Sequence, residues 1–296
     1  MTKFGITVST SLGTRQLTDL VLNGRESKVV VTDYLFGSSR ALYSTAAILF
    51  SGKLNGKDVL YFYGDLGATQ EVALKLTKEL AQGKTTSDSG ENAVSLAELG
   101  GGYTTVKYSP KKKGLSVILE TDKYLILASD TATAQSFWSP VVSGSGSQFP
   151  SYWQFGSNST VLVGGPYLVR SVTIKGSKLD IVGDLENDTT LTVVGAPRSV
   201  KTITFNGRAV TLRASGLGAL DSILVGSITQ LSAAKTSLKL PELQSGWKYA
   251  DSLPEVLPSY SDAKWVVANK TTTNSPWKPY YGDEGGPVLY GCDYGL

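Results

Sequence analysis

Two pairs of neighbouring carboxylates are the residues of this chain best suited to catalysis. Asp184 and Glu186 lie two positions apart, and Asp283 is followed directly by Glu284. Two carboxyl groups held about 5–9.5 Å apart beside a sugar can hydrolyse a glycosidic bond without histidine. Both pairs lie in stretches typical of turns, and nothing in the sequence directs either pair toward a pocket. We therefore interpret them as solvated loop carboxylates.

Residue counts restrict the other catalytic chemistries. The sequence has no histidine and a single cysteine, Cys292. This removes Ser-His-Asp and Cys-His catalysis in their usual forms and the commonest ligand of zinc, copper and iron. Gly83-Lys84-Thr85 resembles the end of a phosphate-binding loop, but Lys78 stands where that loop requires glycine. We expect neither a metal site nor a cofactor.

Four aromatic residues are candidates either for stacking on sugar rings or for packing at a domain interface. They are Trp153, Trp265, Trp277 and Tyr281. Large aromatic side chains dominate cores and interfaces in general. We favour the interface role and keep sugar stacking as the alternative.

Three Asn-X-Ser/Thr sequons are candidates for N-glycosylation. They begin at Asn158, Asn187 and Asn269, all at predicted turns or strand edges. Such acceptor sites occur in surface loops of secreted proteins. The sequons therefore favour a secreted eukaryotic protein.

The elements that would position these residues are strands. A hydrophobic content of 41%, a charged content of 18% and 32 glycines suit an all-β protein with many turns. Asn-Gly dipeptides at residues 23–24, 55–56 and 206–207 each lie between apolar runs and predict type I′ hairpin turns. Val59–Tyr63 is apolar throughout, which predicts a strand buried on both faces.

Two further local predictions concern the middle of the chain. Tyr103–Tyr108 and Leu115–Leu119 read as another hairpin, with Lys111–Lys113 as a solvated turn at its tip. A short helix is expected over Thr131–Trp138, capped by Asp130.

A second block of strands recurs about every ten residues, which predicts a small β-sandwich. The expected strands are Thr160–Val163, Val169–Ile174, Leu179–Val182, Thr190–Val194, Val200–Phe205 and Ala209–Arg213, with Leu238–Leu243 closing the block.

Charge and hydropathy identify no macromolecular partner. The net charge is +3, from 28 basic and 25 acidic residues, and the basic residues form no concentrated patch, so we expect no nucleic-acid binding. No apolar run approaches the roughly 20 residues that span a membrane, so we expect no membrane insertion. The first residues lack the apolar core of a signal peptide.

Several segments together resemble a known family. They are W-K-Y-A-D-S-L-P-E (Trp247–Glu255), S-Y-S-D-A-K-W (Ser259–Trp265), L-Y-G-C-D-Y-G (Leu289–Gly295), L-N-G-R-E-S-K-V-V-V-T-D-Y (Leu22–Tyr34), L-Y-S-T-A (Leu42–Ala46) and G-G-P-Y-L-V-R (Gly164–Arg170). In this order they resemble the second, third and fourth domains of fungal β-galactosidases of glycoside hydrolase family 35. The likeness covers essentially the whole chain.

The resemblance implies a division of labour. In that family a (β/α)₈ barrel carries the retaining hydrolysis of terminal β-D-galactose, and β-rich domains and two jelly rolls surround it. Its acid/base glutamate follows an asparagine, and this sequence has no Asn-Glu dipeptide. The resemblance therefore gives this chain no catalytic residue, no cofactor and no metal. It implies the barrel and the C-terminal jelly rolls as partners, galactosides as a further ligand class, and a secreted location.

We divide the chain accordingly. Residues 1–157 are expected to form the antiparallel β-rich second domain with one short helix, and residues 158–243 the small sandwich of the third domain. Residues 244–296 are expected to be a linker and an incomplete jelly-roll segment, with Trp265 and Trp277 in an exposed apolar patch.

Two functions remain open at this point. The first is a non-catalytic accessory region of a β-galactosidase that buttresses the barrel, so that the chain by itself is not an enzyme. The alternative is a stand-alone carbohydrate-binding or lectin-like β-sandwich protein.

Overall fold

The structure of the chain is a computed structural model that describes residues 2–82, 92–142, 161–218, 220–230, 257–261 and 263–264. The chain divides into two compact units, Met1–Ser232 and Ala233–Leu296. The described residues of the second unit include a turn in which the Tyr260 N–H donates to the Leu257 carbonyl oxygen at 2.9 Å. The helices and strands below belong to the first unit.

The first half of this unit consists of one hairpin and two sheets. The hairpin pairs β1 (Thr2–Thr10) with β2 (Gly13–Leu22). The outer sheet contains, in spatial order, β3 (Val31–Phe36), β4 (Ser39–Ser44), β7 (Gln70–Leu74), β9 (Tyr103–Ser109) and β8 (Ala93–Gly100). The shared sheet contains β10 (Leu115–Glu120), β11 (Tyr124–Asp130), β6 (Lys57–Gly64) and β5 (Ala47–Leu54).

The second half adds two more sheets. The junction sheet contains β12 (Phe137–Trp138), β13 (Leu162–Gly164), β16 (Thr189–Val194), β20 (Ile223–Ile228) and β19 (Arg213–Ala214). The far sheet contains β14 (Leu168–Lys175), β15 (Lys178–Asp184), β17 (Thr202–Phe205) and β18 (Arg208–Val210). The helices α1 (Thr77–Gln82) and α2 (Thr131–Gln135) are short. The all-β prediction is confirmed, although β6 with β11 and β15 with β17 pair in parallel.

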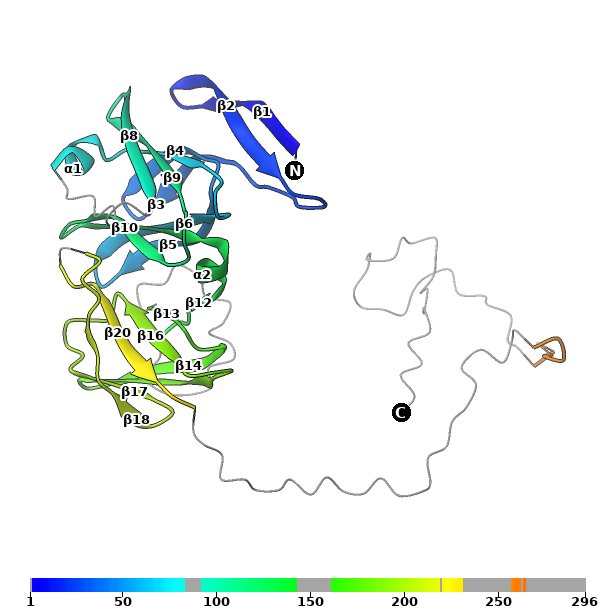
Figure 1. Cartoon of the computed structure of the whole chain (residues 1–296), viewed down its shortest axis with the longest axis vertical. Helices are drawn as coiled ribbons and strands as arrows, with labels where there is room; N and C mark the ends of the chain where they lie inside the picture. Colours follow the sequence, from blue (N-terminus) through cyan, green and yellow to red (C-terminus); the bar gives the residue numbers. More distant parts are fainter. Residues whose placement is uncertain are drawn as a thin grey trace. The chain divides into compact units, whose positions relative to one another are not determined.

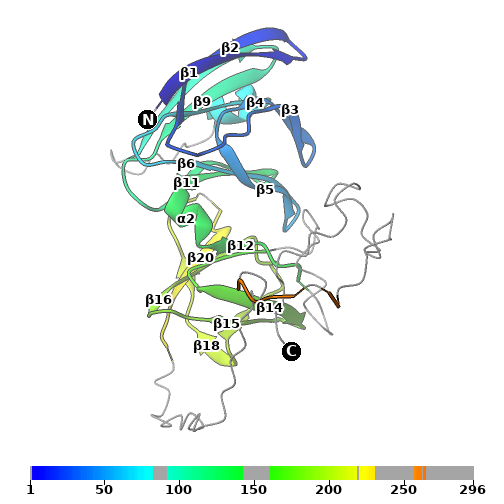
Figure 2. The same ribbon diagram turned by 90° about the vertical axis from the view of Figure 1, so that its right-hand side faces the viewer.

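The sheets are stacked in layers (Figures 1 and 2). The hairpin, the outer sheet, the shared sheet, the junction sheet and the far sheet follow one another, with an apolar core between each neighbouring pair. The outer and shared sheets form a first sandwich, and the junction and far sheets form a second. Because the first sandwich also packs on the second, the shared sheet is covered on both faces.

The sequence of β6 follows from this double burial. Leu60 and Phe62 lie in the core beneath the outer sheet, while Val59 and Tyr61 lie in the core against the junction sheet. All four side chains are fully buried. Side chains alternate between the two faces of a strand, so a strand without a wet face needs apolar residues at consecutive positions. The prediction of a strand buried on both faces is confirmed.

Two of the three predicted Asn-Gly hairpins are present. Asn55 and Gly56 join β5 to β6 with φ angles of 47° and 81°, and Asn206 and Gly207 join β17 to β18 with φ angles of 49° and 77°. Positive φ at both positions is the signature of the type I′ turn.

The third predicted hairpin is wrong. Asn23 and Gly24 form a turn in which the Glu26 N–H donates to the Asn23 carbonyl oxygen at 3.1 Å. This turn ends β2, whose partner is β1, and the chain then crosses to β3. The dipeptide signals a turn but does not identify which strands pair.

The hairpin predicted for Tyr103–Leu119 is also wrong. β9 lies in the outer sheet and β10 in the shared sheet, so the turn that contains Lys111–Lys113 connects two layers. The apolar runs are correct as strands, but their partners are β7 and β8 on one side and β11 on the other. The choice is made by the tertiary core.

The predicted helix is present but shorter. Asp130 caps α2 and accepts a hydrogen bond from the Thr133 N–H at 3.0 Å. The helix ends at Gln135, because Phe137 and Trp138 pair with β13 as β12.

The second block of strands agrees with its predicted spacing. The structure places β13 to β18 within or beside the six predicted ranges, and it adds β19 and β20. β20 (Ile223–Ile228) was not predicted. Leu238–Leu243 and the expected jelly-roll segment, residues 244–296, lie almost wholly outside the described residues.

Substitutions on the two faces of the shared sheet should both destabilise the whole unit. Leu60 and Leu127 are fully buried in the cores on opposite faces. Because a cavity replaces each side chain, Leu60→Ala and Leu127→Ala should each cost about 2–5 kcal/mol of unfolding free energy. Leu35→Ala, at a side chain that is 61% exposed, should change it by less than about 0.5 kcal/mol.

Scanning calorimetry checks the coupling between the sandwiches. One transition should shift downward in both buried variants. Two separate transitions, only one of which responds to Leu127→Ala, would show that the sandwiches unfold independently.

Candidate functional site

A buried ion pair lies where the two sandwiches meet. Lys57 is the first residue of β6 and Glu120 the last of β10, so both stand at one end of the shared sheet. The Lys57 Nζ donates to Glu120 Oε1 at 3.0 Å. The two side chains are 6% and 1% exposed, so neither charge is shielded by water. A buried charge needs such a partner because its desolvation costs several kcal/mol.

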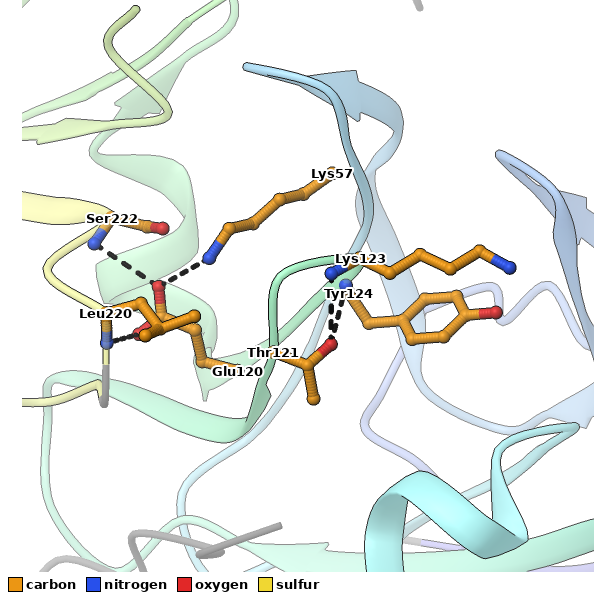
Figure 3. A network of polar contacts seen from close by, with 7 residues as sticks. All are labelled: Lys57, Glu120, Thr121, Lys123, Tyr124, Leu220 and Ser222. Atoms are coloured by element: carbon orange, nitrogen blue, oxygen red, sulfur yellow. Dashed lines mark hydrogen bonds and ion pairs between the residues drawn. The ribbon is translucent and has the colours of Figure 1, made fainter. Parts of the chain in front are cut away.

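The second sandwich completes this site (Figure 3). The Leu220 N–H donates to Glu120 Oε2 at 3.0 Å, and the Ser222 N–H donates to Glu120 Oε1 at 3.2 Å. A Cβ on Gly218 would lie 1.9 Å from Glu120 Oε2. The loop before β20 therefore approaches the carboxylate closely because it carries glycine there. Glu120 links a strand pair of the first sandwich to the backbone of the second.

The surroundings of Glu120 keep it ionised. Burial by itself would raise the pKa of this carboxyl. Hydrogen bonds from Ser222 and Leu220 and the ammonium of Lys57 outweigh burial, so the pKa lies below its ordinary value. Asp130 and Asp58, at the other corners of the shared sheet, behave in the same way: burial opposes ionisation, and hydrogen bonds from Thr133 and Ser38, respectively, hold each pKa low.

The turn after Glu120 is also fixed by hydrogen bonds. Thr121 Oγ1 accepts from the backbone N–H groups of Lys123 at 3.2 Å and Tyr124 at 2.9 Å (Figure 3). The Lys123 carbonyl oxygen accepts from the Asp58 N–H at 2.7 Å. The turn thus ties β10, β11 and β6 together beside the ion pair.

Apolar contacts continue the junction. Tyr61 and Phe137 pack edge to face with centroids 5.4 Å apart, and the Tyr61 hydroxyl donates to Ser129 Oγ at 2.9 Å. Gly195 has a φ of 75°, and a Cβ there would lie 2.5 Å from the Leu54 Cβ. These close contacts indicate that the two sandwiches pack at a fixed position, like the layers of one domain.

The second candidate site is a groove of about 630 Å³ on the first sandwich. It runs along β5, the outermost strand of the shared sheet, and reaches β3, the outermost strand of the outer sheet. The hydroxyls of Tyr34 and Ser51 join these strands by a hydrogen bond of 2.6 Å. A volume of this order is typical of small-molecule sites.

The structure accounts for some of the predicted site residues. Asp184 accepts two hydrogen bonds from Arg170, at 3.1 and 2.6 Å, and both side chains are exposed. Glu186 lies exposed in the next turn. Neither carboxylate lines the groove, which agrees with their interpretation as loop residues. Asn187 is exposed in the turn between β15 and β16.

The other predicted residues lie outside the described part of the chain. These are Trp153, Asn158, Trp265, Asn269, Trp277, Tyr281, Asp283, Glu284, Cys292 and the Gly83-Lys84-Thr85 segment. Among the described residues there is no group of three or more histidine, cysteine, aspartate or glutamate side chains that could hold a metal ion. In that same part of the chain, no helix is long and apolar enough to cross a membrane.

Sequence reasoning missed Lys57, Glu120 and Gln70. Lys57 directly follows the Asn55-Gly56 turn, and Glu120 directly follows the apolar run Leu115–Leu119. A charge at the end of a fully buried strand is a signal that could have been used. It would not have identified the partners, which lie 63 and 100 residues away.

Comparison with known proteins assigns two domain types. Residues 1–137 match the family described as β-galactosidase, domain 2, and residues 138–221 match β-galactosidase, domain 3. Among curated relatives, probable β-galactosidase C of Aspergillus niger is 36% identical over 99% of this chain. Probable β-galactosidase B of Sclerotinia sclerotiorum is 37% identical over 99%, and probable β-galactosidase C of Aspergillus oryzae is 34% identical over 100%. The chain spans 27–28% of the length of these relatives.

Removing the charge of Glu120 should weaken the junction. Glu120→Gln keeps the shape but leaves the Lys57 ammonium buried without a counter-charge, so it should cost about 3–5 kcal/mol of unfolding free energy. Glu186→Gln, at an exposed carboxylate, should cost less than about 0.5 kcal/mol. Urea unfolding of the three proteins near neutral pH measures the difference.

The same variant should change the response to acid. The pKa of Glu120 is lower in the folded than in the unfolded chain, so the unfolded chain binds more protons as the pH falls. The stabilisation is therefore complete above the unfolded value of about 4.3 and is lost as the pH drops through the lower folded value. Glu120→Gln should show a shallower loss of stability below about pH 5. An unchanged acid slope would contradict this role of Glu120.

Proposed function

Because the chain belongs to the β-galactosidase family, with domains 2 and 3 over residues 1–221, we propose that it is a non-catalytic accessory region of a secreted β-galactosidase. In this proposal the longer enzyme is of glycoside hydrolase family 35 and removes terminal non-reducing β-D-galactose with retention. Its catalytic barrel and C-terminal jelly rolls are the partners of this chain.

The packing of the two matched domains is the observation that carries the proposal. They share one sheet that is buried on both faces, and a single carboxylate, Glu120, binds groups from both. A unit packed in this way suits a rigid support, because it holds whatever is attached to it at a fixed position. This proposal assigns the barrel to such a position.

The use of the buried carboxylates supports the same view. Asp58, Glu120 and Asp130 are each bound by a backbone N–H and by a further side chain or cation. Hydrogen bonds hold the pKa of each carboxyl low, so none is suited to act as a general acid near neutral pH. These groups have structural rather than catalytic surroundings.

The purified chain should not hydrolyse 4-nitrophenyl β-D-galactoside above the buffer blank, since in this proposal both catalytic carboxylates belong to the barrel. A β-galactosidase of known activity, assayed at equal concentration, is the positive control. Turnover that follows the chain through successive purification steps would overturn the proposal. Asp184→Asn and Glu186→Gln would then show whether either loop carboxylate takes part.

Secretion predicts a glycan on Asn187. The Asn187-Asp188-Thr189 sequon lies in an exposed turn, where a transferase can reach it. When the chain is directed through the secretory pathway of a yeast host, Asn187→Gln should lose one glycan in the mass of the intact protein. Asn23→Gln, at an exposed asparagine outside any sequon, should lose none. An unmodified Asn187 in the secreted chain would speak against the assignment.

A further inference from the structure

The groove along β5 contains a polar side chain whose hydrogen bonding is incomplete. Gln70, the first residue of β7, lines the groove and is only 2% exposed. Among the described residues its carboxamide makes no hydrogen bond. Buried polar groups are nearly always paired, because an unpaired one loses its water without compensation. A group of this kind that faces a groove is a natural contact for a ligand.

The backbone makes room for this carboxamide. A Cβ on Gly64 would lie 2.3 Å from the Gln70 Cγ and 2.5 Å from its Nε2. Glycine at the end of β6 therefore allows Gln70 to lie flat against the strand. Next to it, Asp65 accepts a hydrogen bond from the Thr131 hydroxyl at 2.6 Å, which fixes a second polar group of the groove.

The lining combines hydrogen-bonding groups with apolar walls. The polar side chains include Tyr34, Ser51, Tyr63, Asp65, Gln70 and Thr131. The apolar walls come chiefly from β5 and include Ala47, Ile48 and Leu49. A ligand that fits must present hydroxyl or similar groups at its rim and an apolar face to the walls.

The charges around the groove favour a neutral ligand. Glu26 and Asp65 are acidic and Lys28 is basic, so an anion would meet a small excess of negative charge. A carboxamide offers two donors and one acceptor. An anion could use only the donors, whereas a hydroxyl group both donates and accepts. Neighbouring hydroxyls on a sugar ring can therefore satisfy both ends of the Gln70 carboxamide.

We propose that this groove is a binding site for a neutral saccharide of one or two rings, with the Gln70 carboxamide as its buried polar anchor. Asp65 and Thr131 bind further hydroxyls, and the wall of β5 packs against the C–H face of the ring. The site uses residues of the first sandwich alone. It therefore does not rest on the proposed accessory function and would hold for a chain that acts independently.

The experiment is a titration of the full chain, labelled with ¹⁵N, with methyl β-D-galactoside and lactose. The side-chain amide signals of Gln70, assigned by their loss in Gln70→Ala, should shift with increasing sugar. Calorimetry should give saturable binding for the same sugars. Absence of shifts and of heat up to the solubility limit of both sugars would overturn the proposal, including the case in which the groove accepts a polypeptide strand instead.

Variants localise the binding. Gln70→Ala should weaken the affinity at least about tenfold, as expected for one lost buried hydrogen-bonding group. Gly64→Ala, which pushes on the same carboxamide, should weaken it as well. Gln230→Ala is the matched control: it removes the same side chain from an exposed site on the second sandwich and should leave the affinity unchanged.

Folding of each variant is checked by its melting temperature. If Gln70→Ala fails to fold, Lys28→Ala, at a partly exposed residue of the groove, takes its place and should reduce affinity while melting normally. Equal affinity in the wild type and in every folded groove variant would place the sugar elsewhere and overturn the proposal.

Discussion

The shared sheet has no face in contact with water, and the remainder of the described structure follows from this constraint. A sheet of four strands that is covered on both sides must be apolar at nearly every position, as β6 and β11 are. It also requires a cover on each side. The outer sheet supplies one, and the junction sheet supplies the other. For this reason the two matched domains cannot be regarded as independent modules joined by a linker.

Burial on both faces moves the polar chemistry to the ends of the strands. Asp58, Glu120 and Asp130 lie at strand ends, and each is held by backbone N–H groups. Such bonds give a carboxylate a low pKa and at the same time fix a neighbouring turn or loop. The groove is the counterpart of this arrangement along the free edge of β5. There the strand has no partner, and Gln70 is left with unfilled hydrogen-bonding capacity.

Local signals allowed part of this structure to be predicted. The type I′ turns at Asn55-Gly56 and Asn206-Gly207 depend on the φ preferences of two residues, and the cap at Asp130 depends on a contact three residues away. The apolar run of β6 identified its double burial. These features are written within windows of a few residues, which is why the sequence suffices for them.

Pairing and site formation depend on longer distances. Nothing near Tyr103–Leu119 indicates that β9 and β10 belong to different layers, because the cores that separate them contain residues from the whole unit. The parallel pairing of β6 with β11 joins strands more than sixty residues apart. Glu120 and the groove acquire their partners only through this pairing. The resemblance to a known family supplied the domain types, but no single residue of either site.

The position of the junction sheet in the sequence has a consequence for synthesis on the ribosome. Leu127 is made before Ile223, the strand residue that helps to cover the same face of the shared sheet. At translation rates of about 5–20 residues per second, the intervening stretch takes roughly 5–20 s to emerge. During that interval the nascent first sandwich presents an apolar face containing Val59, Tyr61 and Leu127 to the surrounding medium. The layered arrangement thus makes the half-synthesised chain a natural client for chaperones.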